Sequence, residues 1–245
     1  MTHLCRLRQS AKPFPTPVNA SILDGAPGDA ALKTLLILPL TLMALPLSAQ
    51  AWDLRLEAPF ASGQDLPATQ VQGTGPTSGS LDTGHGLILT VSHRIVRVVP
   101  VLKFEWNGEW SQLRAGGQIQ QGAASAGSGL RQSGLGAGIN AQFWLPFTGL
   151  AGELGLMERF HSYQYQAAGI DQDRTIARPW LRVGMRWVLP FPGIAPYLAA
   201  SYQEPFTRDR PVAQGSAPSL GAYLGAQCSG QEFQRLFTVG VGISF

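Results

Sequence analysis

The stretch FTVGVGISF, residues 237–245, decides the fold class. Its apolar side chains stand at every second position: Phe237, Val239, Val241, Ile243 and Phe245. The residues between them are threonine, glycine or serine. A period of two is that of a β-strand with one apolar face, whereas an α-helix repeats every 3.6 residues. The stretch therefore predicts a β-strand.

The same alternation recurs in four internal segments, at residues 101–107, 134–143, 153–160 and 181–187. One face of each is apolar, and the other is charged, polar or glycine, with Glu158 as an exception on an apolar face. Strands of a membrane barrel alternate in this way because one face meets lipid and the other a polar lumen. Glycine on the inner wall lets a narrow barrel coil tightly.

The composition supports a membrane barrel over other classes. Charged residues make up 13% of the 245 residues, against about 25% in soluble domains. Glycine is abundant at 29 residues, and the net charge of +3 gives no reason to expect nucleic-acid binding.

A signal peptide is expected at residues 32–51. Lys33 precedes an apolar run at 35–47, which is shorter than the ~20 residues of a spanning helix. The small residues Ala49 and Ala51 form the A-x-A pattern that signal peptidase reads, with Trp52 as the new N-terminus.

Residues 1–31 contain several prolines and show no strand or helix period. Two interpretations stay open: translation starts at Leu32 and this extension is mis-annotated, or the signal peptide has an unusually long, disordered n-region. The barrel domain is then residues 52–245.

The alternation predicts an all-β fold, an antiparallel transmembrane up-and-down β-barrel of about eight strands. The strands are expected near 52–60, 84–95, 97–110, 129–145, 150–165, 175–189, 194–206 and 233–245. Short periplasmic turns are expected around Val96, 146–149 and 190–193, and longer polar extracellular loops at 61–83, 111–128, 166–174 and 207–232. Residues 219–227 could be a short helix or an additional strand, and an additional strand pair would give ten.

The face predicted to line the lumen carries charges of both signs: Lys103, Glu105, Glu153, Arg159, Arg182 and Arg186. Such a set either pairs to fill the lumen or gates an ion path, and pairing is favoured because an unpaired buried charge costs several kcal/mol. No metal site or cofactor is expected, since His85 and His93 lack ligand spacing; a cation held by His161 with Asp171 and Asp173 is the less favoured alternative.

A strand that ends on Phe245, with alternate apolar residues behind it, resembles the C-terminal assembly signal of bacterial outer-membrane barrels. Over residues 52–245 the pattern resembles the small outer-membrane β-barrel proteins typified by the OmpA transmembrane domain and OmpX. This resemblance implies a place in the bacterial outer membrane, contact with its lipid, and delivery by periplasmic chaperones to the barrel assembly machinery. A monomer without nucleic-acid partners is expected.

Three functions remain open. The first is a non-enzymatic barrel of structural or surface-interaction type, and the alternative is a small porin-like pore or transporter for small solutes. The third is a membrane-embedded lipid-modifying enzyme, since some small barrels are lipid A deacylases with a His and a nearby Ser. Adjacent strand residues point to opposite faces, so His161 and Ser162 should diverge, which disfavours the enzyme.

Overall fold

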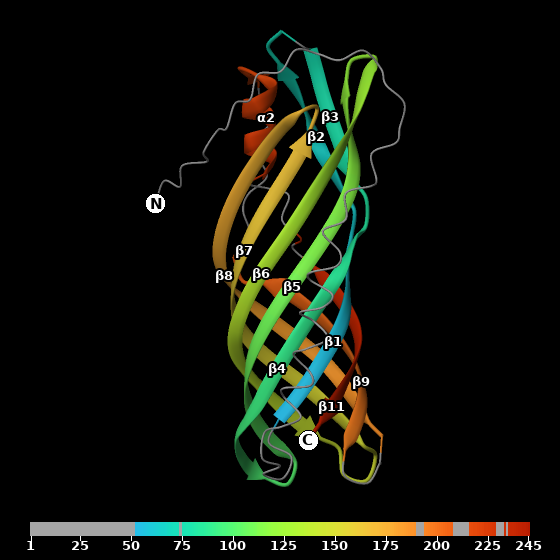
Figure 1. Ribbon diagram of the computed structural model, residues 1–245, viewed down its shortest axis with the longest axis vertical. Coiled ribbons are helices and arrows are strands. Elements are labelled where there is room, and N and C mark those ends of the chain that lie inside the picture. Colours follow the sequence, from blue (N-terminus) through green and yellow to red (C-terminus); the bar gives the residue numbers. More distant parts are fainter. Residues whose placement is uncertain (1–51, 74, 190–193, 208–215, 229–232, 234) are drawn as a thin grey trace, which may run out of the picture. The chain divides into compact units, whose positions relative to one another are not determined.

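Eight antiparallel strands close into a ring in the computed structural model, which describes residues 52–73, 75–189, 194–207, 216–228, 233 and 235–245 (Figure 1). In hydrogen-bonding order they are β1 (Trp52–Ala61), β4 (Gly84–Val99), β5 (Leu102–Gln121), β6 (Ala124–Trp144), β7 (Leu150–Ala167), β8 (Ile170–Val188), β9 (Ala195–Pro205) and β11 (Leu236–Ser244). The ladders β5–β6 and β1–β11 complete the circle. The predicted eight-stranded barrel is confirmed, and residues 237–245 form most of β11.

Four further elements lie outside this ring: β2 (Gln64–Val71), β3 (Gly75–Leu81), β10 (Ser216–Ala217) and α2 (Leu220–Cys228). β3 pairs with the end of β5, β2 pairs with β3, and β10 adds to β2. α2 covers residues 220–227 of the segment left open between helix and strand. Ser219 caps it, since its hydroxyl accepts a hydrogen bond from the Ala222 amide at 3.1 Å.

The turn between β4 and β5 lies at Pro100 and Val101, a few residues beyond the expected position at Val96. The ladder of these strands is irregular between Arg94 and Val96 and again between Arg97 and Val99. Each irregularity breaks the period of two, so the continuation of β4 was not visible in the alternation.

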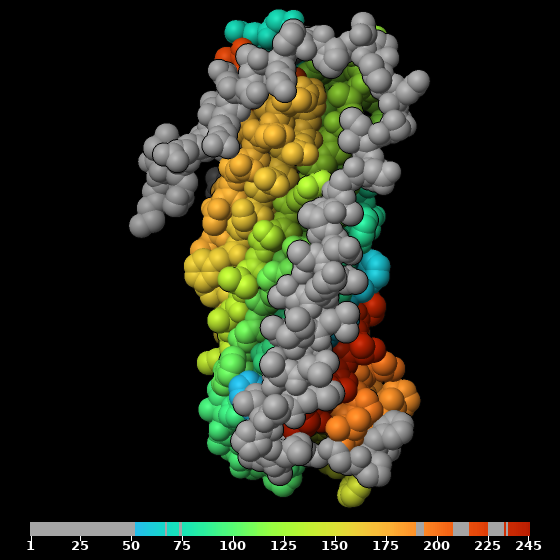
Figure 2. Space-filling view, in the orientation of Figure 1, coloured from blue at the N-terminus to red at the C-terminus, as the bar shows by residue number. Residues whose placement is uncertain are grey.

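The expected loops 111–128 and 166–174 are mostly strand, which corrects the sequence prediction. β5 and β6 continue to a turn at Gly122 and Ala123, and β7 and β8 to a turn at Ala168 and Gly169. Both turns use left-handed backbone, with φ of 56° at Gly122 and 76° at Gly169. Figure 2 shows the golden side chains of β8 against the yellow and green side chains of β7 and β6 along this wall. Part of the expected loop 61–83 likewise forms β2 and β3.

The polarity of the two faces of the wall reverses along β5. From Leu102 to Trp110 its outward residues are apolar or glycine, whereas from Gln112 to Gln120 they are polar, charged or glycine. The inward residues change oppositely, from Lys103, Glu105, Asn107, Glu109 and Ser111 to Leu113, Ala115 and Ile119. We call the part of the barrel level with Leu102–Trp110 of β5 the membrane section. The part level with Gln112–Gln120, together with β2, β3, β10 and α2, is the extension.

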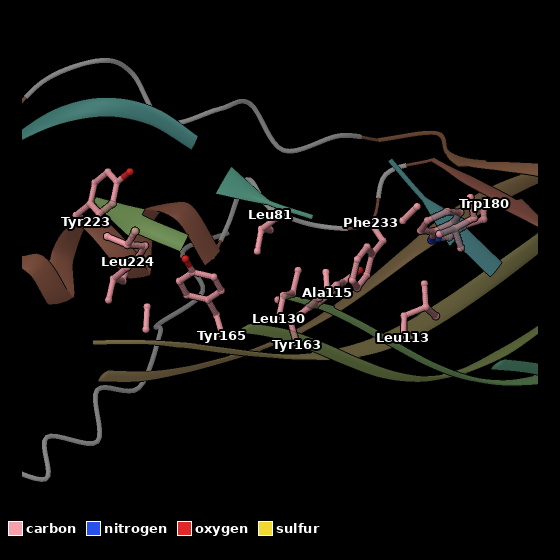
Figure 3. Close-up of a cluster of buried hydrophobic side chains, with 14 of the residues drawn as sticks. Leu81, Leu113, Ala115, Leu130, Tyr163, Tyr165, Trp180, Tyr223, Leu224 and Phe233 are labelled. Carbon is pink, nitrogen blue, oxygen red and sulfur yellow. The ribbon is translucent and has the colours of Figure 1, made fainter. Parts of the chain in front are cut away.

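The extension has an apolar core between β3, β5, β6, β7, β8 and α2. Figure 3 shows this core running from Tyr223 and Leu224 of α2 toward Trp180. Leu224 is fully buried, and burial beside Tyr165 raises the pKa of Tyr223 to about 12, so that its phenol stays neutral. The core therefore closes the barrel above the membrane section.

Several predicted features lie outside the described residues. They are the N-terminal extension 1–31, the signal peptide 32–51 with Ala49 and Ala51, the turn 190–193 and part of the segment 207–232. Trp52, the expected first residue after cleavage, opens β1.

Candidate functional site

The outer wall of the membrane section is apolar all around the ring. Its exposed large side chains include Leu56, Phe60, Trp106, Leu135, Ile139, Phe143, Leu154, Leu156, Phe160, Val183, Met185, Trp187, Leu198, Phe237, Val239 and Val241. The apolar stretch of β5 runs from Leu102 to Trp110, and that of β7 from Leu150 to Phe160, with Glu158 as its one charged outward residue. These lengths match the ~9–11 residues with which a tilted strand crosses a bilayer.

The lumen of the membrane section is crossed by an ion pair between opposite walls. Arg55 on β1 donates two hydrogen bonds to the Glu153 carboxylate on β7, at 2.8 and 2.6 Å. Four ladders separate β1 from β7 in either direction around the ring, so this pair spans the full width of the lumen. Arg186 on β8 also donates to Glu153, and its guanidinium lies over the Tyr197 ring at 4.3 Å.

A second cluster lies nearer the extension. Arg182 donates to Glu57, whose carboxylate also accepts a hydrogen bond from the Thr238 hydroxyl at 2.9 Å. Arg159 donates to Glu109 at 2.7 Å and lies 4.7 Å from the centre of the Trp180 ring. These side chains come from five strands, and all of them are buried.

A third cluster lies nearer the turns and the C-terminus. Lys103 is paired with Glu105 and lies 3.5 Å from the Asp53 carboxylate. Gln142 donates to Glu105, and Arg186 lies 3.3 Å from Asp53. Arg186 therefore joins this cluster to the central pair. Arg55, 3.8 Å from Glu57, joins the central pair to the second cluster, so the charges form one network along the lumen.

The six residues expected on the lumen face all lie inside the barrel. The structure adds five buried charged side chains that the sequence reasoning missed: Asp53, Arg55, Glu57, Glu109 and, nearer the extension, Arg178. The signal was available for the first three, because Asp53, Arg55 and Glu57 alternate with Leu54 and Leu56 in the segment expected to be the first strand.

His161 and Ser162 point to opposite sides of the wall, as the strand period requires. His161 is buried, with its Nδ1 3.1 Å from the Tyr163 hydroxyl and its ring edge-on to Trp180, whereas Ser162 is exposed outside. The His161 imidazole thus packs against Tyr163 and Trp180 inside the barrel and does not face the adjacent serine.

Among the described residues, no group of three or more His, Cys, Asp or Glu side chains is arranged to hold a metal ion. In the same part of the chain, no helix combines the length and the apolar character needed to cross a membrane.

An apolar wall around a charged interior is the reverse of a water-soluble barrel and the pattern of a transmembrane one. The chain forms a β-barrel of the transmembrane type. Its eight-stranded ring, its lipid-facing wall and its filled polar lumen resemble the small members of that class.

No family model and no curated protein sequence matches the chain. Solved structures of several outer-membrane barrels are similar to it. The attachment invasion locus protein Ail of Yersinia pestis is 10% identical with a TM-score of 0.44, and the match covers 80% of this chain and 98% of Ail. Neisserial surface protein A is 11% identical with a TM-score of 0.41, covering 79% and 95%. The outer-membrane protease OmpT of Escherichia coli is 8% identical with a TM-score of 0.36, covering 80% and 94%.

Proposed function

We propose that this protein is a non-enzymatic outer-membrane barrel that does not conduct and that presents its extension as a surface for interaction outside the cell. The observation that carries this proposal is the Arg55–Glu153 pair across the lumen. A solute would have to separate two buried, hydrogen-bonded charges at this level, which is costly in a medium of low dielectric constant.

A second barrier supports the same conclusion. Above the charged network, Trp180, Leu113 and Leu130 are buried in the apolar core of the extension. An ion that entered this apolar core would lose hydration without gaining polar partners, which costs more than passing through a polar lumen. The alternative of a small pore would need both barriers to open.

The extension is the part available for partners. Its outward residues on β5, β6 and β7 are mostly glutamine, serine, arginine and glycine, which suit water or a polar partner and not lipid. We expect the extension to face the outside, with the short turns and both ends of the barrel domain in the periplasm, as the alternation of short and long connections indicates.

Assembly is proposed to follow the route of other outer-membrane barrels. Residues 237–245 would be read by the barrel assembly machinery after delivery by periplasmic chaperones. β11 then pairs with β1 from Ser244 opposite Asp53 to Leu236 opposite Ala61. Because this ladder leaves the ring without a free edge, a monomer surrounded by lipid is the expected state.

Planar-bilayer recording of the purified, folded protein tests the proposal. The expected trace shows no steady channel at moderate voltage. A matched variant, Arg55→Ala with Glu153→Ala, shortens both members of the central pair and should still show no steady channel, because the apolar core above it remains closed. A steady open channel in the wild type would instead establish the pore alternative.

A further inference from the structure

Two arginines face each other on the outer wall just above the apolar belt. Arg114 on β5 is directly opposite Arg131 on β6 in the antiparallel ladder. Both side chains are exposed on the outside. Like charges directly opposite each other in a sheet are destabilising. An anion bound between the two guanidinium groups would remove this repulsion.

The two arginines lie in a shallow groove of about 270 Å³ across β5, β6 and β7. Gln112, Ser133, Ser162 and Gln164 surround the arginines, and the buried residues Leu113 and Gln132 complete the lining. Guanidinium groups bind phosphate oxygens through paired N–H donors, and amides and hydroxyls supply further hydrogen bonds. The groove therefore has the chemistry of a phosphate site.

No acidic side chain neutralises the pair within the part of the chain that the structure describes. Arg114 and Arg131 make no ion pair there. Two acids lie nearby without an ion pair to either arginine: the Asp82 carboxylate beside Gly116, one outward position beyond Arg114, and Asp173 of β8, opposite Gln164. On the other side of Arg131 the facing residue is Gln164, which is neutral.

The position of the groove relative to the hydrocarbon layer indicates which class of phosphate ligand can reach it. Arg114 comes four residues after Trp110, the last apolar outward residue of β5, and Arg131 lies four residues from Leu135 on β6. Four residues of a strand tilted by ~40° rise roughly 10 Å, which reaches the headgroup layer above the hydrocarbon. A lipid held here would lay its acyl chains along Trp110, Leu135 and Phe160.

We propose that this groove binds a phosphate group on the sugar headgroup of an outer-leaflet glycolipid. The assignment rests on the outward orientation of the extension proposed above. It does not depend on whether the lumen conducts, so the bilayer recording and the lipid-binding experiment fail independently.

The test uses the full-length folded protein in neutral detergent micelles, with bisphosphorylated lipid A as the probe. The midpoint of heat-modifiable unfolding is followed as lipid A is added. In Arg114→Gln with Arg131→Gln, the apparent affinity should fall at least tenfold. Arg97→Gln, an exposed arginine at the opposite end of the barrel, is the matched control and should bind as the wild type does. Binding of the double variant within twofold of the wild type would overturn the proposal.

A second readout separates loss of a site from loss of the fold. Without lipid A, the double variant should unfold at the same or a higher temperature than the wild type, because the opposed charges are gone. With lipid A, the order should reverse. A double variant that is less stable in both conditions would show that the arginines serve the fold, and the proposal would be wrong.

The source of the phosphate is distinguished by three further probes. Dephosphorylated lipid A should bind at least tenfold more weakly than the bisphosphorylated form, and inorganic phosphate should compete only weakly. Equal binding of dephosphorylated lipid A would overturn the phosphate assignment. A sulfated oligosaccharide that stabilised the wild type as strongly as lipid A, through the same arginines, would show a site for soluble polyanions and overturn the glycolipid assignment.

Discussion

Replacing Glu153 by glutamine should destabilise the barrel more than any other change of similar size in the lumen. The Glu153 carboxylate accepts two hydrogen bonds from Arg55, at 2.8 and 2.6 Å, and another from Arg186. Glutamine keeps the shape and one acceptor but removes the charge between two buried guanidinium groups. Breaking a buried pair from one side costs about 3–5 kcal/mol, and we expect a loss of that size in the free energy of unfolding.

The assay is equilibrium unfolding by urea of the protein folded in lipid vesicles, followed by tryptophan fluorescence and heat-modifiable migration. Glu158→Gln is the matched control, since Glu158 lies on the same strand but faces outward. Its replacement should change stability by less than about 1 kcal/mol, because a carboxylate near the membrane interface costs little. Adding Arg55→Met to Glu153→Gln should recover part of the loss, since one unpaired cation is then removed.

A loss below about 1 kcal/mol for Glu153→Gln would refute the reasoning. It would mean that water enters the lumen and screens the two guanidinium groups at Arg55 and Arg186, which is the condition for a conducting barrel. An equal loss for Glu158→Gln would mean that the faces of β7 are assigned wrongly.

Three further changes test separate parts of the structure. Val183→Arg places a charge on the lipid-facing wall and should cost about 2–4 kcal/mol in vesicle unfolding, whereas Val183→Ala should be mild. Gly138→Ala should cost about 1–3 kcal/mol in the same assay, since its Cβ would lie 2.1 Å from the Leu156 carbonyl oxygen, while Gly152→Ala, with open space around it, should be neutral. Leu224→Ala should loosen the core of the extension by about 2–5 kcal/mol and speed its proteolysis, and the heat-modifiable migration of the membrane section should persist.

The sequence predicted the ring because alternation is local and each strand carries it. The segment from Asp53 to Glu57 and the stretch 237–245 show the period without knowledge of any partner. The ion pairs could not be derived in the same way. Arg55 and Glu153 meet only because the ring closes with β1 and β7 on opposite sides, and that depends on the registers of all the ladders between them.

The extension was missed for a different reason. Beyond Trp110 the period of two continues in β5, with Leu113, Ala115 and Ile119 on one face. The outward face changes from apolar to polar, since the surroundings change from lipid to water, and the polar composition was interpreted as a loop. The period of two by itself identifies a strand. Which of the two faces is apolar indicates the surroundings of each face.

Accessibility measured residue by residue along β5 tests the central claim most directly. Nitroxide labels are placed singly from 102 to 120 in a background with Cys5 and Cys228 replaced by serine, and collision with oxygen is compared with collision with a water-soluble nickel complex. Even-numbered positions up to Trp110 should favour oxygen, as lipid-exposed sites do, and even-numbered positions from Gln112 should favour nickel. Odd-numbered positions should be protected from both. A single preference along the whole even-numbered face, without a reversal between Trp110 and Gln112, would contradict the division into a membrane section and an extension.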